Sequence, residues 1–348
     1  MGDNHDGQLG DGTHNATNRP ELIVSSNVTA VASGAFHSLF LKSDGSLWAM
    51  GGSFSNLPEQ IVSSNVTAIA AGNGHSLFLK SDGSLWGMGD NHDGQLGVGT
   101  YYNTNQPQLI VSSNVTVIAA GDLHSLFVKS DGSLWAMGYN NFGQLGDGTY
   151  NKTNFPEQIV SSNVMAIAAN GGYLTIPGEN VNYSHSLFVK NDGSLWAMGY
   201  NNFGQLGDGT YNNTNRPEEI VAGGVIAIAA GDGHSLFVKS DGSLWAMGAN
   251  SYGALGGGFS GGTNLPEQIV AGPTGYNQIS IQLLDDSDVL LSFAGIQGAN
   301  YALDWSSGLS PANWQPQATN PAGSNGILLL TNTPDPTINN FWRVRSVQ

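Results

Sequence analysis

The sequence contains no cysteine and few basic residues, and both absences exclude classes of function. Without cysteine, neither disulfide bonds nor thiolate chemistry is available. Ten Lys and Arg against 26 Asp and Glu give a formal net charge of −16, and no basic stretch offsets it locally. Such a field repels nucleic acid and anionic lipid, so we expect no nucleic-acid partner. No apolar run approaches the ~20 residues of a membrane helix, so we expect no membrane insertion.

A sustained helical period is also absent, and the chain instead repeats a short motif. The tetrapeptide HSLF occurs five times, and a tryptophan follows eleven residues after each of its histidines. These residues are His37, His75, His124, His185 and His234, and Trp48, Trp86, Trp135, Trp196 and Trp245. The spacings between successive copies are 38, 49, 61 and 49 residues. Periods of this length are typical of propellers and solenoids.

Each repeat reads as four short strands. In the unit that begins at Val225, VIAIAAG is a continuous apolar run typical of an inner strand. HSLFVKS follows, then the Asp-Gly turn of SDGS, and SLWAMG forms the third strand. A glycine-rich loop, GQLGDGT in most copies, leads to a fourth strand that opens with proline, which edge strands tolerate. The sequence therefore predicts four-stranded antiparallel blades arranged as a β-propeller.

The pattern HSLF…DGSLWAMG.N..GQLGDGT resembles the repeat of the regulator of chromosome condensation family over roughly residues 1–271. The resemblance implies a β-propeller, but members of that family share a scaffold and little chemistry. They include a nucleotide exchange factor, a plant ultraviolet-B photoreceptor, parts of ubiquitin ligases and a secreted bacterial β-lactamase inhibitor. The tryptophans occupy one equivalent position per blade, so we interpret them as packing residues rather than a chromophore cluster. An acidic chain without a basic tail does not resemble the exchange factor.

The fourth strand occurs once more often than the other three, and the extra copy is PELIV at Pro20. The first ten residues, MGDNHDGQLG, also recur at Met88–Gly97 inside a later unit. We therefore expect about five full blades plus an N-terminal half-blade. Three interpretations stay open. The chain is a piece of a longer reading frame; or the Pro20 strand closes a five-bladed ring and releases the Pro266 strand; or the surplus strand pairs with a neighbouring molecule.

The repeat stops near Pro273, which divides a propeller at 1–272 from a second segment at 273–348. The second segment reads as six strands of a small β-sandwich. Its YALDWSSGLSPANWQPQATN…FWRVRS stretch resembles small terminal β-modules on exported proteins of environmental bacteria. That resemblance implies a bacterial protein with an extracellular or cell-surface location, although no signal peptide is recognisable in this chain.

No asymmetrically placed group of residues predicts catalysis. The five HSLF histidines lie one per blade, too far apart to share a metal, and we interpret them as structural. The inner strands carry no carboxylate, and Asp122 and Asp232 at their ends would matter only if they line the central channel. Acidic residues in the GDNHDG loops do not match the ligand spacing of a calcium-binding loop. We therefore expect no enzymatic activity, no cofactor and no metal site.

Two features predict a binding surface. The first is the insertion Asn170–Ser184, a long loop with apolar side chains of its own, as functional loops often have. These side chains are Tyr173, Leu174, Ile176 and Tyr183. The second is a set of aromatic residues between third and fourth strands, alternating with asparagine as in surfaces that stack on sugar rings. The tyrosines are Tyr102, Tyr139, Tyr150, Tyr200, Tyr211 and Tyr252.

Each feature has a structural alternative. The insertion can fold flat on the rim without a function, and aromatic residues before GQLG, such as Phe142 and Phe203, can tuck between blades. We interpret the chain as a non-catalytic exported binding module that recognises a protein or a glycan through its propeller loops. The alternative function is a structural, self-assembling surface protein, joined head-to-tail through open blade edges into a homo-oligomer by strand addition.

Overall fold

The structure is a computed structural model, and every regular element in its described residues is a β-strand. It describes residues 1–176, 179–251, 253–257 and 261–270, and six further strands within 279–347. Contacts divide the chain into two units, Met1–Val238 with Trp245–Glu267 and Lys239–Leu244 with Gln268–Gln348. Within the described ranges no helix has the length and hydropathy that a membrane span requires.

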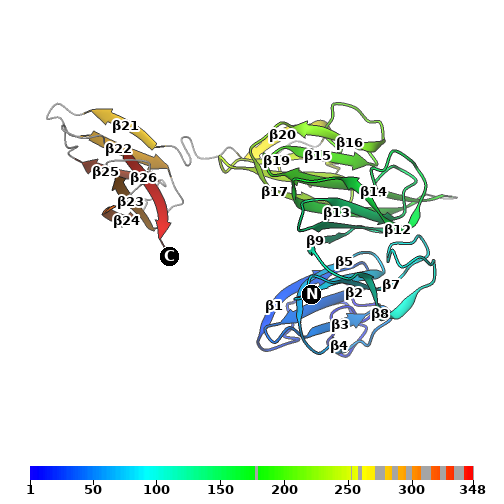
Figure 1. Cartoon of the computed structure of the whole chain (residues 1–348). Coiled ribbons are helices and arrows are strands. Elements are labelled where there is room, and N and C mark those ends of the chain that lie inside the picture. The colour runs from blue at the N-terminus through cyan, green and yellow to red at the C-terminus, as the bar shows by residue number, and fades with distance from the viewer. Residues whose placement is uncertain are drawn as a thin grey trace. The chain divides into compact units, whose positions relative to one another are not determined.

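Five four-stranded antiparallel sheets are each built from consecutive strands, which confirms the predicted all-β fold (Figure 1). Sheet 1 comprises β1 (Val28–Ser33), β2 (His37–Lys42), β3 (Leu47–Gly51) and β4 (Glu59–Val62). Sheet 2 comprises β5 (Val66–Ala71), β6 (His75–Lys80), β7 (Leu85–Gly89) and β8 (Thr104–Val111). Sheet 3 comprises β9 (Val115–Ala120), β10 (His124–Lys129), β11 (Leu134–Gly138) and β12 (Thr153–Val160). Sheet 4 comprises β13 (Val164–Ile176), β14 (Glu179–Lys190), β15 (Leu195–Gly199) and β16 (Thr214–Val221). Sheet 5 comprises β17 (Val225–Ala230), β18 (His234–Lys239), β19 (Leu244–Gly248) and β20 (Thr263–Val270).

A phenylalanine–tryptophan pair joins the second and third strands of each sheet. In sheet 2, Phe78 lies opposite Trp86, and their nearly parallel ring centroids are 6.3 Å apart. Trp86 Nε1 donates to Ser84 Oγ at 2.8 Å, and Lys80 Nζ lies 4.1 Å from the indole centroid. Gly83 in the turn has φ 77°, a left-handed conformation that favours glycine. The repeated SDGSLW sequence thus fixes both the turn and the pair that it brings together.

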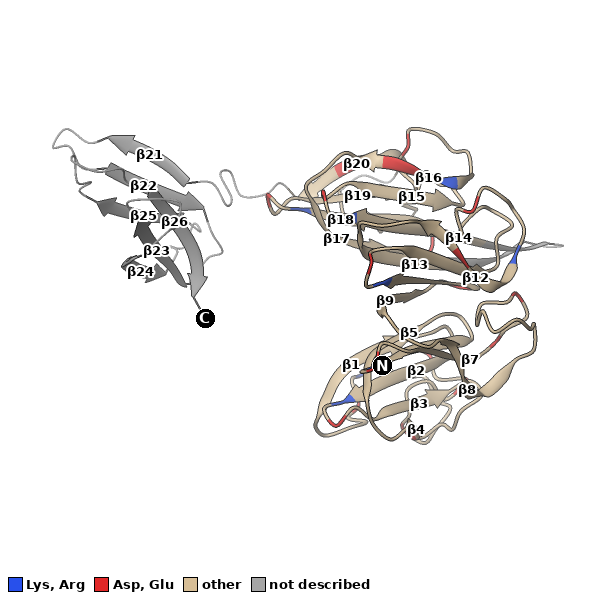
Figure 2. Ribbon diagram, viewed as in Figure 1, with Lys and Arg blue, Asp and Glu red and all other residues tan. Residues whose placement is uncertain are grey.

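Consecutive sheets pack face to face. Between sheets 2 and 3, Leu77, Leu79 and Leu85 meet Val115, Phe127 and Met137. Equivalent clusters join sheets 1 and 2, 3 and 4, and 4 and 5. In each of these four interfaces the earlier sheet contributes a leucine face and the later sheet a Phe/Met face. Charged residues are sparse along these strands (Figure 2).

The N-terminal segment corrects one prediction. Residues 1–27 form no named strand, so the predicted strand at Pro20 is wrong. No third strand precedes it within the described residues to provide backbone partners. The Pro266 strand is also not released, because β20 holds the fourth position of sheet 5. The interpretation in which Pro20 closes a five-bladed ring is therefore not supported.

The first twelve residues instead form a loop that packs on sheet 1. A Cβ on Gly10 would collide with the Met50 side chain, and Gly12 N donates to Asn56 O at 2.9 Å. In the duplicate loop, Gly99 N donates to Asn154 O of sheet 3 at 2.8 Å. The N-terminal copy of MGDNHDGQLG thus contacts sheet 1 in the same way as the duplicate copy at Met88–Gly97, in sheet 2, contacts sheet 3.

Six strands of the second unit form two three-stranded sheets. One has the order β21 (Ile279–Leu283), β22 (Val289–Ala294), β25 (Ile327–Asn332). The other has the order β24 (Gln315–Pro321), β23 (Asn300–Ser306), β26 (Phe341–Val347). The predicted boundary at 272/273 and the proposed sandwich remain predictions.

Candidate binding site on the loop side

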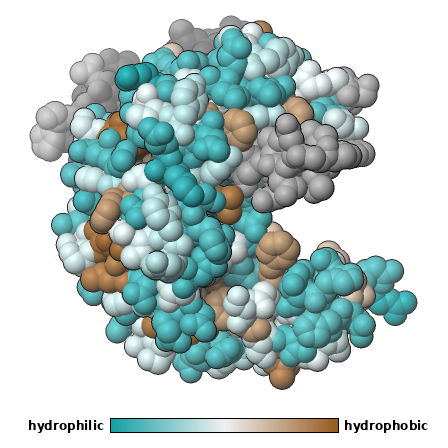
Figure 3. Space-filling view, turned by 90° about the vertical axis from the view of Figure 1, so that its right-hand side faces the viewer, coloured by the Kyte–Doolittle hydropathy of each residue, from teal (hydrophilic) through white to brown (hydrophobic). Residues whose placement is uncertain are grey.

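The loops that carry the predicted tyrosines meet the first turns of the sheets at one end. In a four-stranded antiparallel sheet, the turn after the first strand and the loop after the third lie at the same end. Backbone bonds join them: Tyr139 N donates to Leu123 O at 2.9 Å, and Asp90 N donates to Gly74 O at 2.8 Å. We call this end the loop side. The β7–β8 loop lies on it at the right of Figure 1, and Figure 3 views the molecule from there, where hydrophilic residues predominate.

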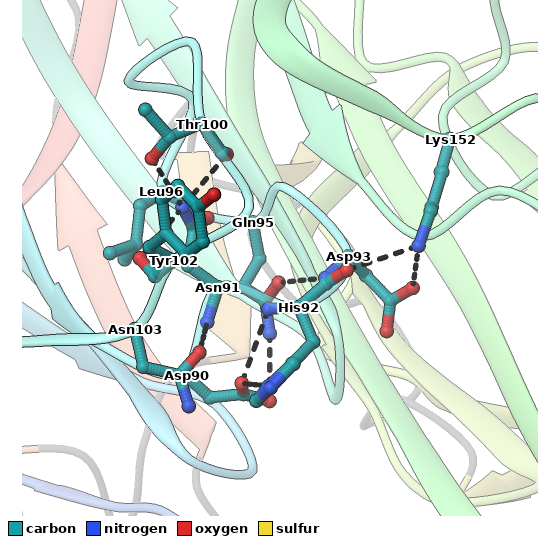
Figure 4. Close-up of polar contacts among 10 residues, drawn as sticks. All are labelled: Asp90, Asn91, His92, Asp93, Gln95, Leu96, Thr100, Tyr102, Asn103 and Lys152. Carbon is teal, nitrogen blue, oxygen red and sulfur yellow. Dashed lines mark hydrogen bonds and ion pairs between the residues drawn. The ribbon is translucent and has the colours of Figure 1, made fainter.

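A buried asparagine holds each long loop in shape. In the loop between β7 and β8, Asn91 Oδ1 accepts the Leu96 N–H at 2.9 Å (Figure 4). Its Nδ2 donates to the carbonyl oxygens of Thr100 at 2.9 Å and Tyr102 at 3.3 Å. Asn140 and Asn201 make the corresponding bonds to Leu145 and Leu206. Sequence reasoning missed these asparagines, although their fixed distance before GQLG was the available signal.

The carboxylates of this loop are engaged within the protein. Asp90 Oδ1 lies 2.6 Å from His92 Nδ1, and Asp90 Oδ2 accepts Gln95 Nε2 at 3.1 Å (Figure 4). Burial alone would raise the pKa of Asp90, but the His92 hydrogen bonds hold it below its usual value. Lys152 from the next sheet's loop pairs with Asp93 at 3.0 Å. Among the described residues, no group of three His, Asp or Glu side chains is placed to hold a metal ion.

The predicted tyrosines divide by exposure. Tyr102, Tyr150 and Tyr211 are exposed, whereas Tyr139 is half-buried. Tyr183 and Tyr200 are buried, so neither presents a free ring to a ligand. Tyr252 lies outside the described residues, as do the side chains of Tyr173, Leu174 and Ile176 on β13. The structure therefore leaves Tyr102, Tyr139, Tyr150 and Tyr211 as candidates on the loop side.

The buried tyrosines form an aromatic cluster with the residues before GQLG. Phe142 packs edge-on to Tyr200 at 4.9 Å between ring centroids, and Tyr183 packs on Tyr200 at 5.6 Å and on Phe203 at 5.5 Å. Tyr139 contacts Phe142 at 6.2 Å. Burial and the negative charges of Asp232 and Asp122 raise the pKa of Tyr183. Tyr183, at the base of the β13–β14 insertion, thus packs on the loop of sheet 4, whose Tyr200 in turn contacts Phe142 in the loop of sheet 3.

A cavity of about 330 Å³ lies between the loops of sheets 2 and 3. Its lining residues are Asp93, Tyr139, Asn141, Tyr150, Asn151 and Lys152. Tyrosine rings, two amides and an ion pair thus converge on one polar recess. Its volume falls at the lower end of the range for small-ligand sites.

A second cavity, of about 610 Å³, is lined by residues from all five sheets, at or near their first turns. Both Asp122 and Asp232 line it. From the sequence, catalysis stayed open only for the case in which these two carboxylates line the central channel. Asn170 at the same cavity donates from Nδ2 to Ala230 O at 3.1 Å. The cavity thus gathers two carboxylates and amide groups, a lining suited to hydrogen-bond donors or cations.

The repeated histidines bridge consecutive sheets. His124 Nε2 lies 2.9 Å from Ser186 Oγ, and Ser186 Oγ donates to Gln144 O at 2.7 Å. Because the serine proton goes to that carbonyl, Nε2 must carry the imidazole proton. His37, His75 and His185 make the same contact to Ser76, Ser125 and Ser235. The serines and glutamines were missed from sequence, although both recur in the units concerned.

Burial sets the charge of these rings. Desolvation lowers the pKa of His75, His124 and His185 to about 3 and that of His37 to about 4. The rings are therefore neutral near pH 7 and too weakly basic for general-base catalysis there.

Comparisons with known proteins agree with this architecture. A family model described as the RCC1-like domain matches residues 55–295, and models of the regulator of chromosome condensation (RCC1) repeat match 28–56 and 1–41. The structure of human WBSCR16 is 20% identical with a TM-score of 0.61, covering 78% of each chain. Prp20p of Saccharomyces cerevisiae is 23% identical with a TM-score of 0.60, covering 72% of this chain and 65% of that one. Comparison with curated proteins gave no significant match.

The solved structures share the fold at these identities, and the chain spans about two thirds of the length of Prp20p. The RCC1-like domain model covers more than half of the residues, and its match agrees with the five-sheet repeat. The chain therefore belongs to the RCC1-like domain family.

Proposed function

We propose that this protein is a non-catalytic binding module that takes a glycan on its loop side. RCC1-like propellers are typically binding or regulatory modules. The main support for this proposal is the 330 Å³ recess. Its lining places Tyr139 and Tyr150 beside Asn141, Asn151 and Lys152. Aromatic faces stack on the apolar faces of sugars, while amide and ammonium groups bond their hydroxyls. Tyr150 is 49% exposed and accessible to such a ligand.

A panel of soluble oligosaccharides, titrated by calorimetry, tests this proposal. Tyr150→Ala should weaken binding of a responding sugar about tenfold, because it removes the accessible stacking ring. Tyr211→Ala is the matched control, since Tyr211 has the same place in the next loop and does not line the recess. Equal losses in both variants, or no sugar bound by the wild type, would overturn the glycan assignment.

The same mixtures test the non-catalytic part of the proposal. They should contain no cleavage products after prolonged incubation. If products form and then disappear in the Asp122→Ala/Asp232→Ala double variant, the 610 Å³ cavity that these residues line would instead be an active site. A protein ligand is the competing outcome on the loop side. Prp20p binds Gsp1p and histones, which supports protein recognition by this fold.

The proposal includes an extracellular or cell-surface location in a bacterium. Its support is the resemblance of the 301–346 stretch to terminal modules of exported proteins. The net charge of −16 also disfavours polyanions as ligands. Fractionation of the native host, with detection of the protein outside the cytoplasm, is the corresponding measurement.

Self-assembly is the second candidate function, and two observations favour it. Val31 is 77% exposed on sheet 1, whereas Ile69, Ile118 and Ile167 at the same position pack into clusters between sheets. Within the described residues, neither Ser38 of sheet 1 nor His234 of sheet 5 has the hydrogen bond that its counterparts make across sheets. In the internal interfaces the histidine of one sheet bonds the serine of the next, so His234 of one molecule could bond Ser38 of another. We therefore propose assembly through sheet faces rather than strand edges.

A further inference from the structure

One of the four interfaces between sheets lacks a component that the other three contain. The loop between the third and fourth strands spans residues 139–152 in sheet 3 but only residues 52–58 in sheet 1. This difference accounts for much of the shorter spacing between His37 and His75, which are 38 residues apart, while His75 and His124 are 49 apart. Sheet 1 therefore has no GQLG loop to place against sheet 2.

In the other interfaces the loop makes two fixed backbone contacts with the following sheet. At sheets 2 and 3, Ser125 Oγ donates to Gln95 O at 2.7 Å, and Gly99 N donates to Asn154 O at 2.8 Å. The same two bonds, at 2.7 and 2.8 Å, recur at the next two interfaces. The loop thus presents a carbonyl and, four residues later, an N–H.

Sheet 2 has both groups that such a loop would contact, the hydroxyl of Ser76 and the carbonyl oxygen of Asn105, but no loop from sheet 1 reaches them. Ser76 is buried, and its hydroxyl contacts only His37 Nε2, at 2.9 Å, among the described residues. No loop glycine in the described chain donates to Asn105 O, which corresponds to Asn154. A cavity of about 790 Å³ lies there, and Ser76, His37, Gly89 and Asn105 line it.

The leucine position of the missing loop is already filled. Leu145 and Leu206 of the GQLG loops are fully buried in clusters between sheets. In the first interface, Phe54 of the short loop packs against the corresponding cluster of Leu39, Leu47 and Ala49. Phe54 therefore takes the place of the loop leucine, and the cavity beside it offers the two backbone contacts.

The His37–Ser76 pair suits recognition rather than nucleophilic attack. Burial lowers the pKa of His37 to about 4, so the ring is a poor base near neutral pH. No carboxylate among the described residues hydrogen-bonds the His37 ring to orient it. A ligand carbonyl that accepts the Ser76 proton would make His37 Nε2 the donor to Ser76, as Gln144 O does for His124 and Ser186.

We propose that this cavity, the Ser76 site, binds a glycine-rich peptide loop of a partner protein. The ligand places a backbone carbonyl against Ser76 Oγ and, four residues later, an N–H against Asn105 O, with a small residue where GQLG has leucine. The site is separate from the Tyr139–Tyr150 recess, so its failure would leave the glycan proposal untouched.

The blocked peptide acetyl-Gly-Gln-Ala-Gly-Asp-Gly-Thr-amide, titrated into the full chain and followed by NMR, tests the site. We expect it to bind more tightly than the same peptide with leucine in place of alanine. Ser76→Ala should weaken binding about tenfold by removing the donor. Ser125→Ala is the matched control, because the chain's own Gln95 already occupies that serine. Unchanged binding in Ser76→Ala, or no binding by the wild type, would overturn the proposal.

A second variant covers the case in which Ser76→Ala fails to fold. Replacing Gly52–Ser55 with the sequence of residues 139–153 restores a full loop to sheet 1. We expect this variant to melt at a higher temperature and to lose peptide binding, because its own loop fills the cavity. Retained binding with the restored loop would place the peptide elsewhere and reject the Ser76 site.

Discussion

At the scale of single residues, the buried histidines make stability depend on pH. The folded rings stay neutral down to about pH 3 or 4, whereas the unfolded chain protonates them near the ordinary value of 6.5. The unfolded state then binds more protons, so the free energy of unfolding falls as the pH drops below 6.5. At pH 5 the loss is about 2 kcal/mol per buried histidine. Urea denaturation at pH 7, 6 and 5 measures it.

His124→Gln should reduce the loss of unfolding free energy between pH 7 and pH 5 by about 2 kcal/mol, because one fewer buried ring takes up a proton on unfolding. It should also lower stability at pH 7 by about 1–3 kcal/mol, because it disturbs a buried hydrogen bond. His92→Gln is the control, as His92 lies in an exposed loop and lacks the contact across sheets. A wild-type protein equally stable at pH 7 and 5 would contradict the assignment of neutral buried rings.

At the scale of elements, the asparagine at the start of each loop should govern the shape of the binding recess. Asn140 Nδ2 donates to Asp147 Oδ1 at 3.1 Å and to Asn151 O at 3.1 Å. Asn140→Asp would place an acceptor against these acceptors in a fully buried position, which should cost about 3 kcal/mol. Chemical denaturation measures the loss, and calorimetry should show weaker sugar binding at Tyr150.

Asn141→Asp adds the same charge one residue later, at an exposed position. It should change stability by less than about 0.5 kcal/mol. Equal destabilisation by the two variants would show that net charge, rather than the buried amide, sets the loop. This pair also shows which signal was overlooked, because within YNNFGQLG only Asn140 holds the fixed distance before GQLG that Asn91 and Asn201 share.

The strands themselves were predictable because their determinants are local. Alternating and continuous apolar runs, the Asp-Gly turn and the proline before the fourth strand each act within a few residues. The Pro20 segment shows the limit of this reasoning. Its sequence matches the other fourth strands, yet a strand forms only where a neighbouring backbone supplies hydrogen bonds. Contacts between sheets, such as His124 to Ser186, join residues far apart in sequence, and spacing did not identify the partners.

At the scale of the whole molecule, repetition predicted the architecture, while function depends on departures from it. Three departures stand out: the short loop of sheet 1, the extended β13–β14 hairpin, and sheets 1 and 5, which each pack on one other sheet among the described residues. Each was visible as an irregular spacing or a surplus copy. The sequence did not show the structural result of each irregularity. A cavity such as the Ser76 site depends on which polar groups lack a hydrogen-bond partner in the folded chain, and those partners are far apart in sequence.

Among the described residues, sheets 1 and 5 each pack on one other sheet, which makes self-association the sharpest test at this scale. Each internal interface pairs a leucine face with a Phe/Met face and adds a His–Ser bond, so a second copy can supply both at the termini. The N-terminal loop covers Met50 but leaves Val31 exposed. Light scattering coupled to size exclusion should therefore give a mass that rises with concentration.

Val31→Lys should return that mass to the monomer, because burying an unpaired ammonium opposes the contact. His234→Ala should do so less completely, since it removes only the hydrogen bond. Leu109→Lys controls for added charge, because Leu109 is 48% exposed on an outer strand rather than on the Val31 face of sheet 1. Association that survives Val31→Lys but not Leu109→Lys would move the interface to outer strands, in favour of pairing through edges. A monomer at every concentration would reject self-assembly and leave ligand binding as the proposal to be tested.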